Sequence, residues 1–149
     1  MEKLPFKTID QHQDDIIDAF ASLCGEREVM LDYLIDLGSA LAPMELLYKT
    51  DNHLVQGCMS KVWLMEVEKE GLLFFQADSN TAITKGLISL LLKAVSGQSI
   101  LAIAAAKFYF VEAIGISELI GWQRASGFSH MIKEIKLKAL SRLAQSRHA

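Results

Sequence analysis

The sequence predicts an α+β fold, in which an N-terminal helical pair precedes a small antiparallel β-sheet and further helices pack on that sheet. Three observations predict this order. Apolar residues recur at helical spacing in the first third, the period changes to two between residues 62 and 76, and helical spacing returns from residue 82. The last segment is a basic helix. With 149 residues and 51% hydrophobic side chains, we expect one domain over residues 1–149, with 1–9 flexible and 144–149 frayed.

Two helices are predicted at the N-terminus. Thr8 and Gln11 have the spacing of a capping box, and Gly25 ends the helix that they start. Apolar residues then recur on one face of this helix, at Ile16, Phe20, Leu23 and Cys24. This periodicity places Cys24 in the core. The second helix is predicted from about Glu26 and ends between Gly38 and Ala42, before a proline.

The middle of the chain predicts a β-hairpin and then a buried helix. Alternating side chains from Val62 to Val67, a turn at residues 68–71 and a second strand over residues 72–76 form the hairpin. Asp78 and Ser79 provide oxygen atoms that can cap the following helix, over residues 82–95. The only charges of that helix are Lys85 and Lys93, so we expect it to be mostly buried.

The C-terminal part is predicted to be helical. Residues 99–113 fit one or two short helices, although Phe108–Val111 also fits a short strand, and residues 115–121 are a connector. From about Ser126, an amphipathic helix combines an apolar face with basic residues. Its basic face is either solvated or receives an acidic partner.

Composition excludes several classes of function. The 15 Lys and Arg residues and 18 Asp and Glu residues give a net charge of −3, so there is no overall basic field for nucleic acid or an anionic membrane. Polar residues interrupt the most apolar stretch, residues 87–106, and no signal peptide is predicted. We therefore expect a cytoplasmic protein with reduced cysteines. The two cysteines form no CxxC motif and the histidines have no metal-ligand spacing, so no metal site is predicted.

Cys58 is the candidate reactive residue. It follows Gly57 at the junction of a loop and a strand, where a bare glycine backbone lets another molecule's sulfur approach. A free thiol has a pKa of about 8.5, so reactivity requires a cation or backbone amides nearby, and Lys61 and Arg124 are the candidate cations. The residues alone leave two alternatives open. Cys58 could be a buried hydrophobic residue, or it could work with His53 as a base in a hydrolase or acyltransferase.

Two further residues have structural interpretations. Trp63, in the hairpin, is predicted to belong to the core. Lys85, on an otherwise apolar helix, either extends to the surface or pairs with a carboxylate.

The order of these elements resembles the SufE family of sulfur-acceptor proteins, which includes the CsdE paralogue. The residues that carry the resemblance are Gly57-Cys58-x-Ser60-x-Val62-Trp63, then Asp78-Ser79 before Ile83-x-Lys85-Gly86-Leu87, then Arg124-x-x-Gly127. The resemblance extends from about Ile16 to Leu143 and implies a SufE/IscU-like fold. The chain departs from the family pattern at Gln56, where proline is common, at Ala77 and Asn80 in the second motif, and at Ala125.

The resemblance implies a sulfur acceptor and activator of a PLP-dependent cysteine desulfurase of the SufS or CsdA kind. Cys58 would accept persulfide sulfur and relay it to an iron–sulfur scaffold of the SufBCD kind. Such a protein is a sulfur-transfer accessory rather than a standalone enzyme, and a non-catalytic interaction module is a further alternative. No cofactor would be bound, because PLP belongs to the desulfurase and the persulfide on Cys58 is transient.

The same resemblance implies roles for other residues. Arg124 would support the thiolate or contact the partner, and the loop around residues 52–60 would swing out when the desulfurase docks. The loop and partner positions that it implies are Asn52, Gln56, Gly57, Ser60, Trp63, Asp78 and Lys85.

Overall fold

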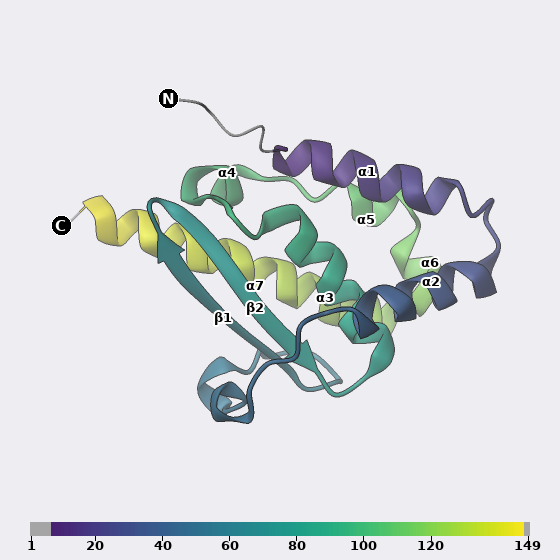
Figure 1. Cartoon of the computed structure of the whole chain (residues 1–149), viewed down its shortest axis with the longest axis horizontal. Coiled ribbons are helices and arrows are strands. Elements are labelled where there is room, and N and C mark those ends of the chain that lie inside the picture. Colours follow the sequence, from purple (N-terminus) through teal and green to yellow (C-terminus); the bar gives the residue numbers. More distant parts are fainter. Residues whose placement is uncertain (1–6, 148–149) are drawn as a thin grey trace.

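The computed structural model describes residues 7–147 and has the predicted α+β architecture (Figure 1). The elements are α1 (Ile9–Ala21), α2 (Arg27–Ser39), the 3₁₀ turns η1 (Leu46–Tyr48) and η2 (Asp51–His53), β1 (Val62–Lys69), β2 (Leu72–Ser79), α3 (Ala82–Val95), β3 (Gln98–Ser99), α4 (Ile100–Ala105), α5 (Phe110–Ala113), α6 (Ile116–Ile120) and α7 (Trp122–Arg147). Thr8 caps α1 at the N-terminal end, and at the C-terminal end α7 continues to Arg147. Helical structure therefore extends into both of the ends predicted to be flexible or frayed. Residues 1–6 and 148–149 of those ends lie outside the described residues.

The predicted capping box at the start of α1 is present. The Thr8 hydroxyl accepts a hydrogen bond from the Gln11 N–H at 3.1 Å, and the Gln11 side chain accepts one from the Thr8 N–H at 2.8 Å. The prediction for Cys24 is wrong. Because α1 ends at Ala21, Cys24 lies in the turn before α2, where its φ is +57° and its side chain is exposed.

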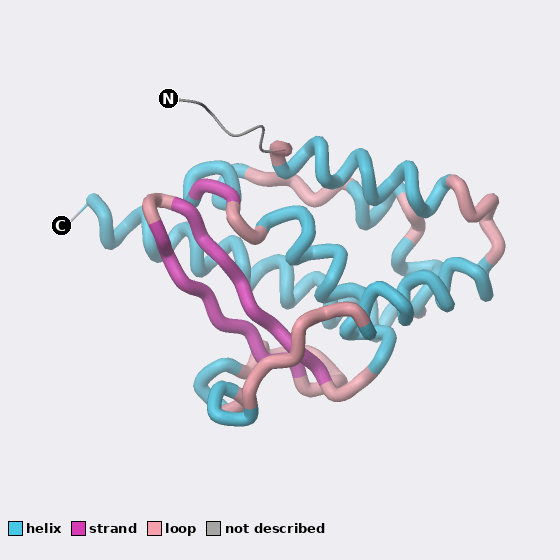
Figure 2. Tube along the Cα trace, in the orientation of Figure 1, coloured by secondary structure: helices cyan, strands magenta, loops and turns pink. Residues whose placement is uncertain are grey.

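The three strands form an antiparallel sheet in the order β1-β2-β3 (Figure 2). The register runs from Val62 opposite Ser79 to Lys69 opposite Leu72, and β3 pairs with the start of β2. Alternate residues are buried on one face, among them Val62, Leu64 and Leu73. The period of two predicted this face, but β2 extends three residues beyond the predicted end, because residues 77–79 pair with residues 62–64 at the start of β1.

Helix α3 is the centre of the core. It contacts α1, α2, β2 and α7, so most of the helix is buried, as its scarcity of charges predicted. Its contact with α2 is a close backbone approach, because a Cβ added at Gly38 would lie 2.5 Å from the Gly86 nitrogen. Glycines therefore set the distance between α2 and α3.

The C-terminal half differs from the sequence prediction in three places. The strand alternative for residues 108–111 is wrong, because α5 begins at Phe110. The predicted connector contains the short helix α6, and α7 begins at Trp122, four residues before the predicted start. Short helices of this kind escape sequence analysis because too few residues carry the periodicity.

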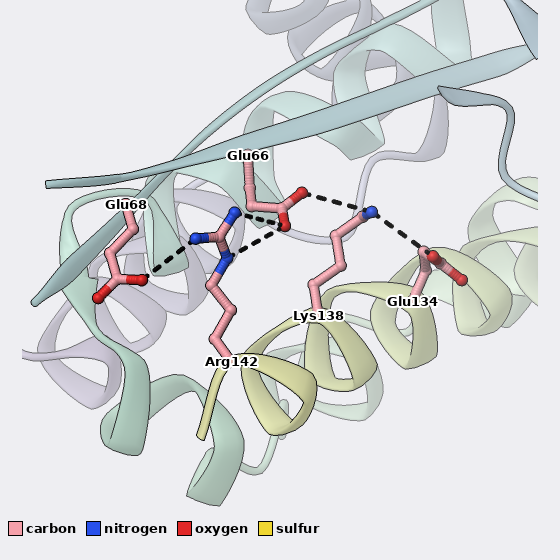
Figure 3. Close-up of polar contacts among 5 residues, drawn as sticks. All are labelled: Glu66, Glu68, Glu134, Lys138 and Arg142. Atoms are coloured by element: carbon pink, nitrogen blue, oxygen red, sulfur yellow. Dashed lines mark hydrogen bonds and ion pairs between the residues drawn. The ribbon is translucent and has the colours of Figure 1, made fainter. Parts of the chain in front are cut away.

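Ion pairs hold the C-terminal half of α7 against the β-hairpin (Figure 3). Arg142 donates hydrogen bonds to Glu66 at 3.2 and 3.3 Å and to Glu68 at 3.1 Å. Lys138 pairs with Glu66 at 3.4 Å and with Glu134 at 3.8 Å. Part of the basic face that the sequence left available for an acidic partner is thus neutralised within the chain. Across the described part of the chain, no helix has the length and apolar character needed to cross a membrane.

Candidate functional site

Cys58 lies in a short loop, residues 56–61, that precedes β1. The base of the loop is closed by a hydrogen bond from the Val55 N–H to the Val62 carbonyl at 2.9 Å and by an isolated bridge between Leu54 and Trp63. Gly57 has a φ of +90°, a conformation that residues with a Cβ rarely adopt. The glycine before the cysteine thus allows the sharp change of direction that presents Cys58.

Side chains at the start of α3 hold the second half of the loop. The Asn80 side-chain oxygen accepts a hydrogen bond from the Lys61 N–H at 3.1 Å. The Ser60 hydroxyl lies 2.9 Å from the Thr81 hydroxyl and 3.3 Å from the Thr84 hydroxyl. These contacts hold the loop in its resting position. Asn52 and Gln56, two of the positions that the resemblance implies, are exposed.

Helix α7 holds the other side of the loop. The Cys58 thiol donates a hydrogen bond to the Gly127 carbonyl, with 3.4 Å between sulfur and oxygen. A Cβ added at Gly57 would lie 2.5 Å from the His130 ring, so His130 packs directly on the loop. Nothing in the local sequence predicts this role of His130, because the contact joins residues that are far apart in the chain.

A cavity of about 20 Å³ adjoins the Cys58 side chain. Its deep wall is apolar and comes from Leu87 of α3 and from Phe128 and Met131 of α7, all three of which are buried. The other lining residues are Met59, Ser60, Thr84, Gln123, Arg124 and Gly127. This volume is enough for about one water molecule or one atom of similar size. His53 is not among the lining residues; it lies in η2, before the bridge at the base of the loop.

Burial controls the protonation of Cys58 in this conformation. The side chain is half-buried, and burial raises the pKa of the Cys58 thiol above its ordinary value. Arg124 shares the cavity, but its guanidinium donates a hydrogen bond to the Ile120 carbonyl at 3.4 Å. In the resting protein Cys58 is therefore a protonated thiol at neutral pH, and support of the thiolate by Arg124 stays a prediction.

The raised pKa predicts how the reactivity of Cys58 depends on pH. In a Cys24→Ser background, where Cys58 is the only thiol, the rate of alkylation should reach half its maximum above pH 8.5, the approximate pKa of a free cysteine. The thiolate is the reactive form, so a raised pKa moves the curve to higher pH. A midpoint below that of free cysteine, measured with iodoacetamide, would contradict the sheltered thiol seen here.

Asp78 does not cap α3, contrary to the sequence prediction. Its side chain is 2% exposed and accepts hydrogen bonds from the Met44 N–H at 3.2 Å and the Ser79 N–H at 2.8 Å. It also pairs with Lys49 at 3.0 Å and with Lys85 at 3.7 Å. Helix α3 begins after Thr81, which makes no side-chain capping hydrogen bond. Asp78 instead fixes the segment between α2 and the Cys58 loop, and of the two interpretations of Lys85, pairing is the observed one.

Trp63 lies outside the core, contrary to prediction. It is half-buried opposite Asp78, on the face of the sheet turned away from the main core, and the Lys49 ammonium lies 5.3 Å from the centre of its ring. This is the geometry of a cation–π contact. Trp63 and Asp78 thus hold Lys49 between them.

A larger groove of about 490 Å³ adjoins the cavity and shares Met59, Ser60 and Arg124 with it. Ile35 of α2 and the first residues of α3 form its other wall. Met59, next to Cys58 in the chain, is 73% exposed. Cys58 therefore lies beside an accessible surface that combines an exposed apolar side chain with an arginine.

Comparisons with known proteins show which family the chain is similar to. Residues 14–139 match the family described as "SufE: Fe-S metabolism associated domain". An uncharacterised SufE-like protein of Rhizobium meliloti is 37% identical over 140 residues, with 87% of this chain and 96% of that protein covered. One of Rhizobium etli is 34% identical over 136 residues, with 88% and 91% covered.

Two further comparisons extend the likeness. SufE-like protein 1 of Arabidopsis thaliana, described as chloroplastic/mitochondrial, is 29% identical over 137 residues; the match covers 91% of this chain but 37% of the plant protein. A solution structure of a hypothetical protein from Thermus thermophilus has a TM-score of 0.74 at 16% identity, covering 89% of this chain and 96% of that one, and shows the shared fold. The family match spans the Cys58 loop, the start of α3 and the part of α7 that meets them, and this chain belongs to the SufE family, which is associated with Fe–S metabolism.

Proposed function

We propose that this protein accepts sulfane sulfur on Cys58 from the persulfide of a PLP-dependent cysteine desulfurase and relays it to an iron–sulfur cluster scaffold. The observation that carries the proposal is the cavity beside Cys58, which has an apolar wall and about the volume of a single atom. A persulfide differs from a thiol by one sulfur atom. Membership of a family associated with Fe–S metabolism supports the same assignment.

The transfer is a thiol–persulfide exchange. The Cys58 thiolate attacks the outer sulfur of the partner's persulfide, a new S–S bond forms to Cys58, and the S–S bond on the partner breaks. The partner's cysteine leaves as a thiolate, and the transferred sulfur, with its proton, is now carried by Cys58. No oxidant or reductant is needed, because one S–S bond replaces another.

This reaction requires two positions of the loop. In the resting position the Cys58 thiol is half-buried and bonded to the Gly127 carbonyl, which protects a loaded sulfur from reductants and oxidants in solution. For the exchange, the sulfur of Cys58 must reach the partner's persulfide. The hydrogen bonds from Ser60 and Lys61 to the start of α3 must therefore open when the desulfurase docks. We expect Met59 and Arg124, which line both the cavity and the adjoining groove, to contact it.

Intact mass spectrometry tests the proposal. The protein is mixed with a cysteine desulfurase and L-cysteine, and its mass is recorded without reductant. We expect a gain of one sulfur atom in the wild type and in Cys24→Ser, no gain in Cys58→Ser, and faster turnover of the desulfurase when the protein is present.

Cys24 provides the control within the same chain. It is exposed, whereas Cys58 is half-buried, so non-specific persulfidation would modify Cys24 first. Sulfur on Cys24 but not on Cys58 would contradict the proposal. So would hydrolysis of an activated thioester by the protein alone with loss of that activity in His53→Ala, the outcome that a hydrolase predicts.

A further inference from the structure

Gly127 is a glycine that the resting structure does not require. It lies inside α7, a helix of 26 residues, where glycine is less favourable than alanine by about 1 kcal/mol. Its φ is not among the positive values that favour glycine. A Cβ added there would lie 3.5 Å from the Cys58 Cα, 3.7 Å from its sulfur and 3.8 Å from its Cβ, which are ordinary van der Waals distances.

Other buried glycines of the chain show the contrast. A Cβ at Gly86 would lie 2.2 Å from the Leu34 carbonyl oxygen, and one at Gly38 would lie 2.5 Å from the Gly86 nitrogen. Steric overlap requires glycine at those two positions. At Gly127 neither overlap nor backbone conformation does, although its missing side chain faces the reactive sulfur.

The space left by that missing side chain is part of the cavity beside Cys58. The cavity is about 20 Å³, so it has room for one further atom of roughly water size or slightly more. A methyl group on Gly127 would project toward the same sulfur and fill part of this volume. The thiol form of Cys58 would still fit, whereas a form with one more sulfur would have less room inside the cavity.

We propose that Gly127 is a specificity-determining residue: its missing side chain provides the volume that holds the outer sulfur of the Cys58 persulfide. The inference rests on the proposed function, because it concerns the loaded form of the same cysteine. The outer sulfur is soft and polarizable, and it would contact the apolar wall made by Leu87, Phe128 and Met131. Alanine at this position would push the outer sulfur out of the cavity toward solvent.

The test compares Gly127→Ala with the wild type, both in a Cys24→Ser background. Persulfide is formed with inorganic polysulfide, so that loading does not depend on any protein partner. The Cys58 thiolate attacks a sulfur of the reagent, an S–S bond forms to Cys58, an S–S bond of the reagent breaks, and a shorter polysulfide leaves. Intact mass confirms that one sulfur has been added.

Cyanide then reports how well the outer sulfur is sheltered. Its carbon attacks that sulfur, the S–S bond breaks, thiocyanate leaves, and Cys58 is left as a thiolate. We expect the persulfide of Gly127→Ala to be lost about fourfold faster than that of the wild type, the factor that corresponds to the burial of one methylene-sized group. The alkylation rate of the unloaded thiol should be the same in both proteins.

Ser126→Ala is the matched control. Ser126 is an exposed neighbour in α7 that does not line the cavity, so this variant changes helix propensity without changing the site, and its persulfide should behave as in the wild type. Equal rates of cyanolysis in Gly127→Ala and the wild type would overturn the inference. Faster alkylation of the unloaded thiol in Gly127→Ala would also overturn it, because the glycine would then serve the resting loop.

The two proposals can fail separately. If a desulfurase does not load Cys58 but the polysulfide-loaded Gly127→Ala protein loses sulfur faster, the sulfur-transfer function is wrong and the role of Gly127 in holding a persulfide stands. If a desulfurase loads Cys58 but the cyanolysis rates are equal, the function stands and the role of Gly127 is wrong.

Discussion

Gly86→Ala is expected to lower the free energy of unfolding by about 3 kcal/mol, which corresponds to a fall in Tm of about 10 °C. The added Cβ would lie 2.2 Å from the Leu34 carbonyl oxygen, 2.7 Å from the Leu34 Cγ and 2.9 Å from its carbonyl carbon. The carbonyl belongs to the backbone of α2, so the helices must separate. The strain outweighs the gain in helix propensity, which is about 1 kcal/mol.

Gly127→Ala provides the control, since it is the same substitution in another buried helical position. Its Cβ meets only ordinary contacts, so we expect a free energy of unfolding equal to or slightly above that of the wild type. Thermal and urea unfolding measure both variants. Equal stability of Gly86→Ala and Gly127→Ala would show that α2 and α3 do not cross as closely as described.

The Gly86 variant has a further expected consequence for the site. Thr84 and Leu87, on either side of Gly86 in α3, line the cavity beside Cys58. If α3 moves away from α2, these two side chains move relative to α7. We therefore expect the alkylation rate of Cys58 to rise in Gly86→Ala, under conditions where the variant is still folded.

Asp78→Ala is expected to cost about 2 to 3 kcal/mol of stability. The substitution removes the acceptor for the Met44 N–H and the counter-charge of Lys49 and Lys85. Both lysines are partly exposed and can turn to water, but the buried Met44 amide loses its hydrogen bond. Hydrogen exchange of the Met44 amide should accelerate with the loss of stability.

Asp51→Ala is the matched control, because Asp51 is an exposed aspartate in the same segment of the chain. Surface substitutions of this kind change stability by less than about 0.5 kcal/mol. If Asp78→Ala unfolds at the same urea concentration as Asp51→Ala, the segment before the Cys58 loop is held by its apolar contacts and not by Asp78.

The Asp78 effect should depend on pH. Burial raises the pKa of Asp78, but the hydrogen bonds from Lys49, Met44 and Ser79 lower it by more, so that it lies below its ordinary value. A carboxyl group whose pKa is lower in the folded state stabilises the fold above its unfolded pKa of about 3.9, and this stabilisation is lost as pH falls through the folded pKa. The difference in stability between wild type and Asp78→Asn should therefore be full near neutral pH and shrink below about pH 4.

Two of the errors of sequence analysis share a physical cause. Cys24 continues the apolar periodicity of α1, yet the helix ends three residues earlier, and periodicity does not report where hydrogen bonding stops. Asp78 has the residue type and position of a cap, but the strand pairing with β1 continues through Ser79. The carboxylate of Asp78 therefore accepts a hydrogen bond from the Met44 N–H and pairs with Lys49. In both cases the residue type fits two environments, and only the contacts of distant segments select one.

The sequence by itself determined the α+β class, the capping box of α1, the β-hairpin and the buried helix α3, and it indicated Cys58 as the candidate reactive residue. These follow from interactions between residues a few positions apart, or from a motif in which the residues are adjacent. The tertiary structure alone decided the surroundings of that residue. The thiol of Cys58 meets the carbonyl of Gly127, 69 positions away, and the loop contacts His130, because α7 packs against both the loop and α3. The cavity exists only where these three segments meet, so no local pattern could predict it.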